Sequence, residues 1–373
     1  MGSLVCFVAM RTSLLRRPVA LALALVALAS ARDGFAQQPA SRPPPWIPGL
    51  PVPVYLPPTF TWGAPSQAAP PAVAGQPPPS AIPPQTSPPP PMPQGALDQA
   101  GQFQQAFLQS EATEILRALV AALPAAKKQK VDGIPMAIDT QSGEVNAFAG
   151  CENGKSFMAI TAPLLRIMGH IAEAKAADEI TGGQHVARYT TLAADAVKQG
   201  AQPPDPPAGF YGSEANDPRK LARQRIVLDE MLSFVLGHEL GHHYLGHTGC
   251  ANGDVAGNLD PRELGRIATQ IVPGLNQPNE AAADIAGTQN LLDVGVTRPG
   301  GLTEMGGVLT LQFFGSLQQL TPTTVATGLL RTHPAPQLRI PLVQSTAQAW
   351  RTSRAAGGTG ASPFPFPFPF PFP

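Results

Sequence analysis

The ten residues from His238 to His247 constrain this chain more than any other segment, because they hold four of its seven histidines. They read H-E-L-G-H-H-Y-L-G-H. Residues four apart lie on one face of an α-helix, so His238 and His242 can present two imidazoles to a single ion. Glu239 then lies beside that ion rather than on it. The pattern H-E-x-x-H therefore requires a helix here and predicts a zinc site on one of its faces.

A catalytic zinc ion takes three protein ligands and keeps one open position, so another part of the chain must supply the third ligand. In metzincins the motif continues to H-E-x-x-H-x-x-G-x-x-H, but Leu245 and Thr248 stand at the last two of those positions. His247 is about half a helical turn out of phase with His238, so it points to the opposite face while the helix persists. The better candidate is Glu280, in the segment N-E-A-A-A-D that follows a loop containing Pro and Gly.

This second segment predicts a helix that ends near Leu292 and carries two carboxylates on one face. Glu280 and Asp284 are spaced i,i+4 in the sequence, so both point the same way from a helix. Glu280 can bind the metal, and Asp284 can hold the distal nitrogen of a zinc-binding histidine. The alternative is that both are ordinary surface carboxylates at the start of a helix.

A third segment, T-H-P-A-P-Q-L-R-I, pairs one His and one Arg at the end of a predicted helix. Hydrolysis of an amide builds negative charge on the tetrahedral oxygen, and that charge needs a fixed donor or cation aimed at it. His333 and Arg339 are suitable residue types for this role. By themselves they fit a loop His and a surface Arg equally well, so this segment indicates a catalytic site only together with the H-E-x-x-H and N-E-A-A-A-D segments.

Taken in order, H-E-L-G-H, N-E-x-x-A-D and T-H-P-x-x-x-x-R-I resemble the HtpX-like, CAAX-prenyl-endopeptidase-like family of gluzincin zinc metallopeptidases. Segments 145–150 and 156–161 are similar to the edge-strand region of that family. The resemblance covers roughly Val131 to Pro341. It is interrupted by an insertion at about 170–223, where the family runs quickly into its zinc helix.

The resemblance implies one Zn²⁺ per chain, and a protein or peptide substrate bound as an extended strand beside the edge strand. The implied metal ligands are His238, His242 and Glu280; Glu239 is the general base; Asp284 orients a ligand histidine; and His333, with Arg339 nearby, stabilises the transition state. His247 matches a position where the family often has His, and it is assigned no catalytic role.

The expected fold is α+β and mostly helical: a zincin-like metallopeptidase domain with a small antiparallel sheet whose edge strand borders the active-site cleft. Apolar residues at helical spacing predict a first helix that ends before Pro124. Short strands with glycine turns are expected at 136–140, 144–149 and 156–161. Further helices are expected at 164–180, 186–198, 219–246, 261–271, 280–292 and 302–319.

The N-terminal residues 1–31 read as a secretory signal peptide, with arginines before an apolar run and an A-x-A site after it. Ala36 offers a second cleavage site. The apolar run is too short to span a bilayer comfortably, and no later stretch is long enough, so no stable membrane span is expected after cleavage. The protein is therefore expected to be exported, to the periplasm or outside the cell. The alternative is a membrane tether formed by an uncleaved signal.

Proline sets the expected limits of the folded domain. Between residues 39 and 93 there are 22 prolines, so 37–95 is expected to be a disordered, extended linker. The metallopeptidase domain is expected at 96–350, followed by a disordered tail at 351–373 that ends in alternating Pro and Phe. Basic and acidic residues balance at 25 each, and no basic stripe is present, which excludes nucleic acid as a partner.

Of the three cysteines, Cys6 leaves with the signal peptide, so Cys151 and Cys250 remain. Two cysteines in an oxidising compartment favour a disulfide. The resembled family brings the edge strand and the end of the zinc helix near each other, which implies a bond that braces the cleft. Two free buried thiols are the alternative.

These observations predict a secreted or periplasmic zinc-dependent endopeptidase that hydrolyses peptide bonds with a zinc-activated water and a glutamate general base. A second hypothesis is a zinc-bound chaperone or scaffold that holds unfolded proteins with little or no turnover, since a strand-binding cleft would serve both roles. The presence of all the catalytic residue types argues against an inactive site. Casein cleavage that a chelator abolishes would distinguish the two.

Overall fold

The computed structural model describes residues 91–141, 143–152, 154–250, 254–255, 277–321, 333 and 336–358, all within one compact unit that spans 79–373. The predicted signal peptide, most of the predicted linker, the predicted helix at 261–271 and most of the Pro/Phe tail lie outside the described residues.

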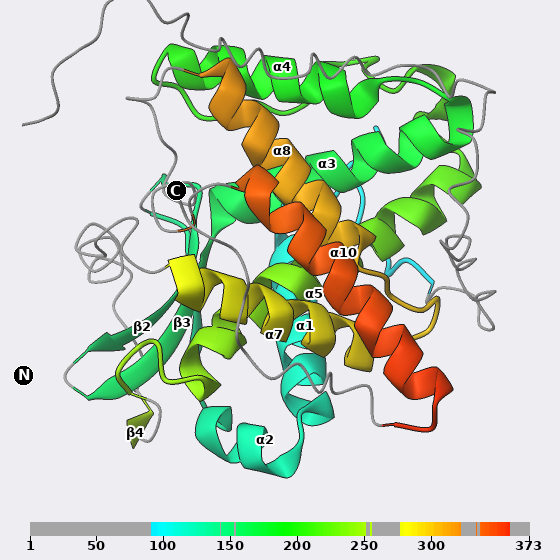
Figure 1. Cartoon of the computed structure of the whole chain (residues 1–373). Coiled ribbons are helices and arrows are strands. Elements are labelled where there is room, and N and C mark those ends of the chain that lie inside the picture. The colour runs from blue at the N-terminus through cyan, green and yellow to red at the C-terminus, as the bar shows by residue number, and fades with distance from the viewer. Residues whose placement is uncertain are drawn as a thin grey trace, which may run out of the picture. The chain divides into compact units, whose positions relative to one another are not determined.

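The described part of the chain is mostly helical, with one small sheet, which confirms the predicted α+β class (Figure 1). Its elements are α1 (Gln105–Ala122), α2 (Ala125–Val131), β1 (Met136–Asp139), β2 (Ala147–Glu152), β3 (Lys155–Thr161), α3 (Ala162–Thr181), α4 (His185–Lys198), a short 3-10 helix (Gly212–Asn216), α5 (Pro218–Tyr244), β4 (Asp254–Val255), α7 (Gln277–Gly295), α8 (Met305–Leu320) and α10 (Pro336–Ala355).

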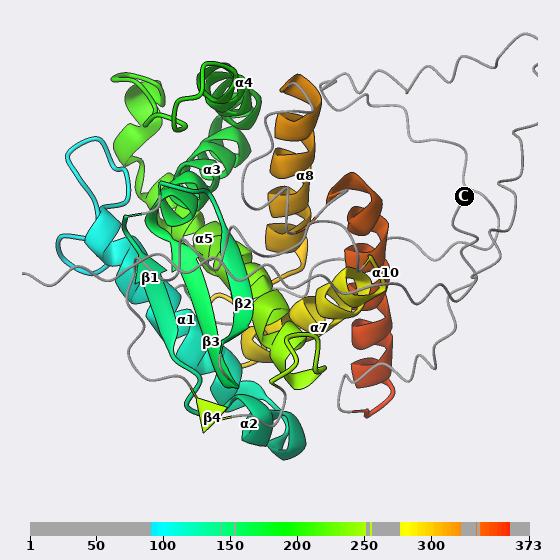
Figure 2. The same cartoon turned by 90° about the vertical axis from the view of Figure 1, so that its left-hand side faces the viewer.

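The sheet is mixed, so the prediction of an antiparallel sheet was wrong in part. Strands β2 and β3 form an antiparallel hairpin that turns at Gly154, where φ is 76°. Strand β1 pairs with the other side of β3 and is parallel to it, and β4 adds a short parallel pairing to β3. The order β1-β3-β2 places two mutually antiparallel strands on either side of β3, which explains the mixture (Figure 2). Among the described residues, β2 therefore has one unpaired edge.

Helix α5 lies at the centre of the described helices and carries the H-E-x-x-H motif. Asp217 caps its N-terminus by accepting from the N–H of Arg219, and Pro218 occupies the first turn, where a missing N–H costs nothing. Its residues are buried without interruption from Gln224 to Gly241, because α1, α3, α7 and α8 pack around it. A helix that is enclosed in this way holds its side chains in fixed positions.

The contact between α5 and α7 is close because small residues face each other across it. A Cβ atom added at Gly287 of α7 would lie 2.9 Å from the backbone nitrogen of His238. One added at Gly241 would lie 2.9 Å from the Cβ of Ala286. Since real Cβ atoms do not approach so closely, larger side chains at these positions would push the two helices apart. This close approach brings the first turn of α7 against the motif.

Two helices were not predicted, α2 and α10, and both ends of the folded region extend beyond the predicted boundaries. Helix α10 runs side by side with α8, and it continues past residue 350 because the indole of Trp350 donates to Asp293 and Arg351 pairs with Glu304. At the other end, Arg225 donates to the carbonyl of Pro91 at 2.7 Å, which ties down the end of the predicted linker.

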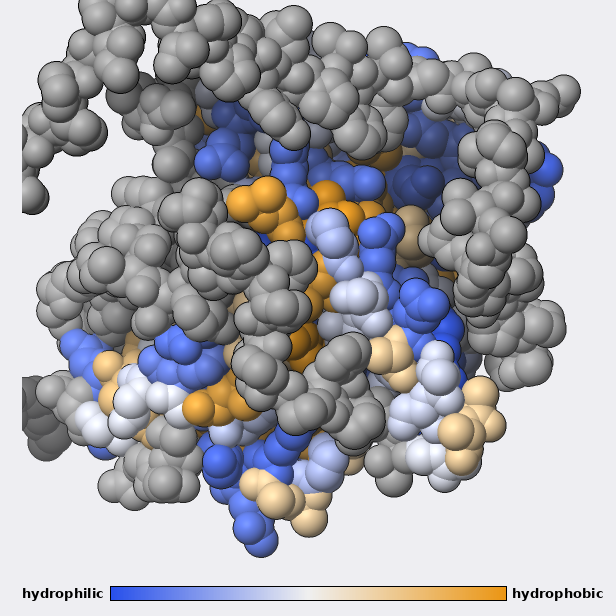
Figure 3. Space-filling model, in the orientation of Figure 1, coloured by the Kyte–Doolittle hydropathy of each residue, from blue (hydrophilic) through white to orange (hydrophobic). Residues whose placement is uncertain are grey.

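No helix within the described residues combines the length and the apolar character that crossing a bilayer requires. On the face drawn in Figure 3, apolar residues lie between hydrophilic ones. In the part of the chain that the structure describes, the large apolar side chains that remain exposed come from different elements and loops: Leu245, Val296, Met305, Leu320 and Leu338.

Candidate metal centre

Four side chains from three separate segments of the chain meet at one point beside α5. They are His238, His242, Glu280 and His333, and one ligand atom from each lies within 4.8 Å of all the others. The two histidines lie one turn apart on α5, Glu280 comes from the first turn of α7, and His333 comes from the segment before α10. The structure thus brings together all three predicted metal ligands and the predicted transition-state stabiliser.

The spacing of three of these donors fits a zinc ion. The Nε2 atoms of His238 and His242 lie 3.0 Å apart, and the Glu280 carboxylate lies 3.3 Å from the second of them and 3.5 Å from the first. A tetrahedral zinc ion with bonds of about 2.1 Å holds its ligand atoms about 3.4 Å apart. Two neutral imidazoles and one carboxylate are also a ligand set that catalytic zinc sites use. The residues therefore fit the metal that the motif predicts.

Nδ1 of His238, the ring nitrogen that points away from the other ligand atoms, is held by a buried ion pair between Asp284 and Arg339. The Nδ1–H group donates to Asp284 at 3.0 Å, and Asp284 in turn accepts from Arg339 at 2.7 and 2.6 Å. Burial alone would lower the pKa of Arg339, but the Asp284 carboxylate outweighs it and raises that pKa. Asp284 stays ionised, because Arg339 and His238 hold its pKa below the usual value despite complete burial. A charged carboxylate here fixes the imidazole in the orientation that leaves Nε2 for a metal.

Glu280 is surrounded by nitrogen donors. Its Oε2 lies 2.8 Å from Nδ1 of His333 and 3.4 Å from Nη1 of Arg339. Burial on its own would raise the pKa of Glu280, but the facing His333, His238 and His242 lower it far below the usual value. The carboxylate is therefore ionised, which is the state that a metal ligand needs.

His333 joins the metal centre to the edge strand and to the predicted general base. Its Nε2–H donates to the carbonyl of Ala147, the first residue of β2, at 3.2 Å. The same atom lies 3.4 Å from Glu239 Oε1. Its ring therefore lies between the unpaired edge of β2 and the carboxylate of α5. The contact with a backbone carbonyl could not have been read from the sequence, because any residue at position 147 offers one.

Arg339 was expected to lie near His333 and to add positive charge at the reacting oxygen. Its guanidinium pairs with Asp284 and Glu280, and Arg339 also lines the pocket that contains His333. An arginine that is paired in this way neutralises the two carboxylates and fixes their positions. The i,i+4 spacing of those carboxylates could have indicated the pairing, because an arginine can bridge two acids on one helix face.

A small pocket, which the sequence did not predict, opens beside Glu239 and His333. Its walls are mostly apolar and come from α5, α8 and the start of α10. The lining residues are Phe234, Val235, His238, Glu239, Thr310, Leu311, Phe314, His333, Pro336 and Arg339. The hydroxyl of Thr310 donates to the carbonyl of Gly306 in its own helix, so it presents little polarity to the pocket.

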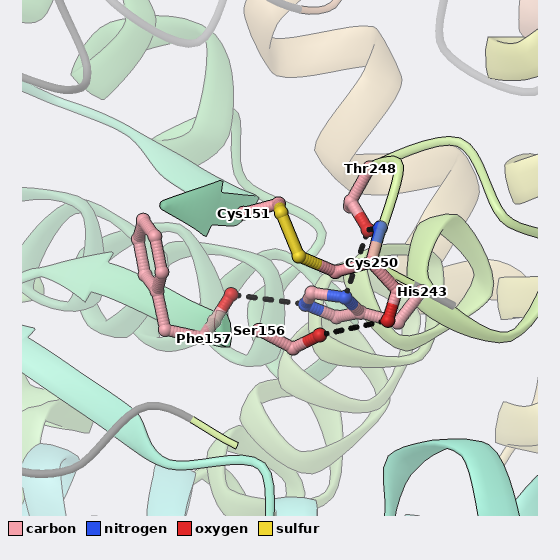
Figure 4. Close-up of a disulfide and its surroundings, with 6 residues drawn as sticks. All are labelled: Cys151, Ser156, Phe157, His243, Thr248 and Cys250. Atoms are coloured by element: carbon pink, nitrogen blue, oxygen red, sulfur yellow. Dashed lines mark hydrogen bonds between the residues drawn. A yellow bond between two sulfur atoms is a disulfide. The ribbon is translucent and has the colours of Figure 1, made fainter. Parts of the chain in front are cut away.

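A disulfide between Cys151 and Cys250 joins strand β2 to the loop after α5, with Cα atoms 5.7 Å apart (Figure 4). Two hydrogen bonds support the same junction. The Ser156 hydroxyl donates to the carbonyl of Cys250 at 3.2 Å. His243 donates from Nε2 to the carbonyl of Phe157 at 2.9 Å, so it faces the sheet and not the metal centre. The edge strand and the end of the zinc helix are thus fixed to each other.

Comparison with known proteins gives one match. The family model described as Peptidase family M48 matches residues 108–253, from α1 to just beyond the zinc helix. The match ends before α7. The assignment of Glu280, Asp284, His333 and Arg339 to the same site therefore rests on the distances in the structure, not on the family match. No curated protein and no solved structure matches this chain. Residues 108–253 therefore match a Peptidase family M48 domain, which confirms the family resemblance drawn from the motifs.

Proposed function

We propose that this protein is a zinc-dependent endopeptidase whose substrate lies extended along the free edge of β2. The family match supports a zinc metalloprotease in general. The observation that carries the finer proposal is the position of His333, with Nε2 against both the Ala147 carbonyl and Glu239. A peptide added to this edge would pass directly over the metal centre.

The backbone of β2 offers the hydrogen bonds that such a peptide needs. The carbonyl of Asn146 accepts from Thr161 N on the β3 side. Because successive residues of a strand point their backbone groups to opposite sides, Ala147, Ala149 and Cys151 direct theirs to the unpaired edge. The Ala147 carbonyl already accepts from His333, so a peptide would pair with Ala149 and Cys151. Main-chain bonds to these groups would bind a peptide without regard to its sequence.

The reaction follows from the residues around the scissile bond. Zinc, when bound, polarises the scissile carbonyl and lowers the pKa of water. Glu239 accepts the proton of the attacking water and delivers it to the leaving amine. The Nε2–H of His333, which donates to the Ala147 carbonyl in the free protein, donates instead to the oxygen that gains negative charge. The apolar walls around the site exclude bulk water, which strengthens both interactions.

The apolar pocket gives this substrate a preference. A peptide on β2 would place one side chain in the pocket beside Glu239. Phe234, Val235, Leu311 and Phe314 would favour an apolar side chain there, and would disfavour a charged one, which would lose its hydration without gaining a partner. A peptide-library cleavage profile should show an apolar preference next to the cleaved bond and weak selection elsewhere.

The decisive experiment compares Glu239→Gln with the wild type. The variant keeps all three ligands, so we expect unchanged zinc content and a loss of peptide hydrolysis of about 10²–10⁴-fold. Both quantities are measured on the same sample, with casein and a fluorogenic peptide, and a chelator should abolish wild-type activity. Near-wild-type turnover in the variant would overturn the general-base assignment. Zinc-loaded wild type that binds unfolded casein without cleaving it would favour the chaperone hypothesis.

We also propose that the protein is exported. The N-terminal pattern supports this, and a disulfide that braces the site fits an oxidising compartment. The mass of the exported protein should correspond to cleavage after residue 31 or 36. An intact N-terminus in a membrane fraction would indicate a tether instead.

A further inference from the structure

Helix α5 ends in a turn that folds the chain back over His242. Gly246 has a φ of 85°, and its N–H donates to the carbonyl of His243 at 3.0 Å. The next N–H, of His247, donates to the carbonyl of His242 at 2.8 Å. This pair of bonds is a Schellman motif, and its left-handed residue is usually glycine because a Cβ atom would be strained there. His247 is therefore placed by the turn and not by the phase of the helix.

The side chain of His247 reaches the outward nitrogen of a predicted metal ligand. Its Nδ1 lies 3.0 Å from Nδ1 of His242. The other nitrogen of His242, Nε2, faces Nε2 of His238 and the Glu280 carboxylate. A neutral imidazole that binds a metal through Nε2 carries its proton on Nδ1. His242 then donates this proton to His247, whose Nδ1 is the acceptor.

The same arrangement exists at the first ligand. Nδ1 of His238 donates to Asp284 at 3.0 Å, so each metal-facing imidazole has an acceptor behind it. One acceptor is a buried carboxylate and the other is a neutral imidazole. Partners of this kind fix the tautomer and the ring orientation of a ligand histidine.

We propose that His247 is a positioning residue of the metal centre, which holds the Nδ1–H of His242 and so aims its Nε2 at the metal. The inference rests on the proposed zinc site. It differs from a ligand role, because the His247 nitrogen faces the far side of the His242 ring. His247 is also absent from the group of ligand atoms that converge in the described residues.

The loop that carries His247 is held at several points. Three residues on, Cys250 is bonded to Cys151 of β2 and its carbonyl accepts from Ser156 (Figure 4). The hydroxyl of Thr248 donates to Nδ1 of His243 at 3.3 Å. These contacts limit the loop to positions near the end of α5, so the acceptor is already in place when the metal binds.

The test compares His247→Asn with His247→Leu. The Oδ1 of asparagine stands where Nδ1 of histidine stands, two bonds beyond Cβ, so it restores an acceptor. Leucine has nearly the same size and shape without one. The zinc dissociation constant is measured by competition with a chromophoric chelator at one pH. We expect His247→Leu to weaken zinc binding by about 10–100-fold, as loss of such a partner does, and His247→Asn to bind within a few-fold of wild type.

Two results would overturn the inference: wild-type affinity in His247→Leu, or equal weakening in the asparagine and leucine variants. Circular dichroism and mapping of the Cys151–Cys250 bond check that each variant is folded. If the leucine variant does not fold, His247→Ala takes its place against asparagine. A wild-type chain that binds no zinc would instead refute the proposed function, so the two failures are distinguishable without any activity assay.

Discussion

His238 and His170 are both buried histidines with a carboxylate at Nδ1, and they differ at Nε2. For His170, Nδ1 lies 3.2 Å from Glu173 and Nε2 lies 2.9 Å from Asp205, which is itself paired with Arg166. For His238, Nδ1 lies 3.0 Å from Asp284, while Nε2 faces the Nε2 of another histidine at the same distance. Both rings have an acid near each nitrogen, but Nε2 of His238 also faces a second histidine, so this side of the ring points into a group of converging donors.

The difference distinguishes a structural histidine from a candidate ligand. With acceptors at both nitrogens, His170 has no lone pair to offer. Burial on its own would lower its pKa, but Asp205 and Glu173 outweigh burial and raise it, which favours the charged form of the ring that joins α3 to the loop before α5. Around His238 the converging nitrogens and carboxylate need a shared cation. Burial and a carboxylate neighbour are common to both sites, so only the direction of Nε2 separates them.

The largest expected effect is the loss of the third ligand. Glu280→Ala should weaken zinc binding by well over about 100-fold, beyond the range for residues that act behind a ligand. Glu173→Ala should leave zinc binding unchanged and lower the free energy of unfolding by about 1–3 kcal/mol for each buried donor that loses its acceptor. Those donors are the N–H of Phe103, the hydroxyl of Tyr211 and Nδ1 of His170. Metal analysis and urea unfolding of both variants test the contrast, which fails if Glu173→Ala also strips zinc.

The next largest effect concerns His333, which shares the metal centre but is proposed to act on the substrate. His333→Phe should lower kcat by about 10²–10³-fold, because a donor to the developing oxyanion is lost, with zinc content and KM nearly unchanged. Steady-state kinetics on zinc-replete enzyme measure this. An unchanged kcat would make His333 an ordinary loop residue, and a loss of zinc would make it a ligand.

A smaller effect is expected behind the first ligand. Asp284→Asn removes the charge that faces His238 and Arg339, so zinc affinity should fall by about 10–100-fold. The matched variant, Asp205→Asn, removes the charge that faces His170 and should leave zinc affinity within experimental error. Chelator competition on the two proteins decides this. Equal zinc affinities would show that the acid behind the ring does not matter to the metal.

The smallest effect is a pH dependence of stability at His170. Its folded-state pKa is raised above the ordinary value of 6.5, so the folded protein holds the proton more tightly. The resulting stability is fully present below pH 6.5 and is lost as the pH rises through the folded pKa. Its size should be on the order of 1 kcal/mol, that of one hydrogen bond.

The stability difference between wild type and His170→Asn should therefore be larger at pH 6 than at pH 9. Urea unfolding at the two pH values measures it. A difference that grows with pH would reverse the assigned sign and remove the cationic role of His170.

The sequence predicted the helix of the motif well because its periodicity, its Asp217-Pro218 start and its buried core are local features. It did not predict α10, since Pro336 and Pro341 interrupt the helical pattern there. It predicted the strands and the antiparallel β2–β3 pairing but not the parallel pairing of β1, because strand direction depends on where β1 docks, and nothing in residues 136–139 indicates their partner. The sequence analysis placed His247 on the face opposite His238 by helical phase and assigned it no role. That argument does not apply, because the helix ends at Tyr244.

By itself the sequence determined which side chains can bind a metal and move a proton: His238, His242, Glu239 and Glu280. It did so because ligand chemistry and i,i+4 spacing are properties of residue type and helical repeat. Only the tertiary structure decided what surrounds them. Arg339 pairs with Asp284 and Glu280, the Ala147 carbonyl contacts His333, and the turn at Gly246 brings His247 against His242. These contacts join segments through packing and backbone geometry, which no local pattern in a single chain encodes.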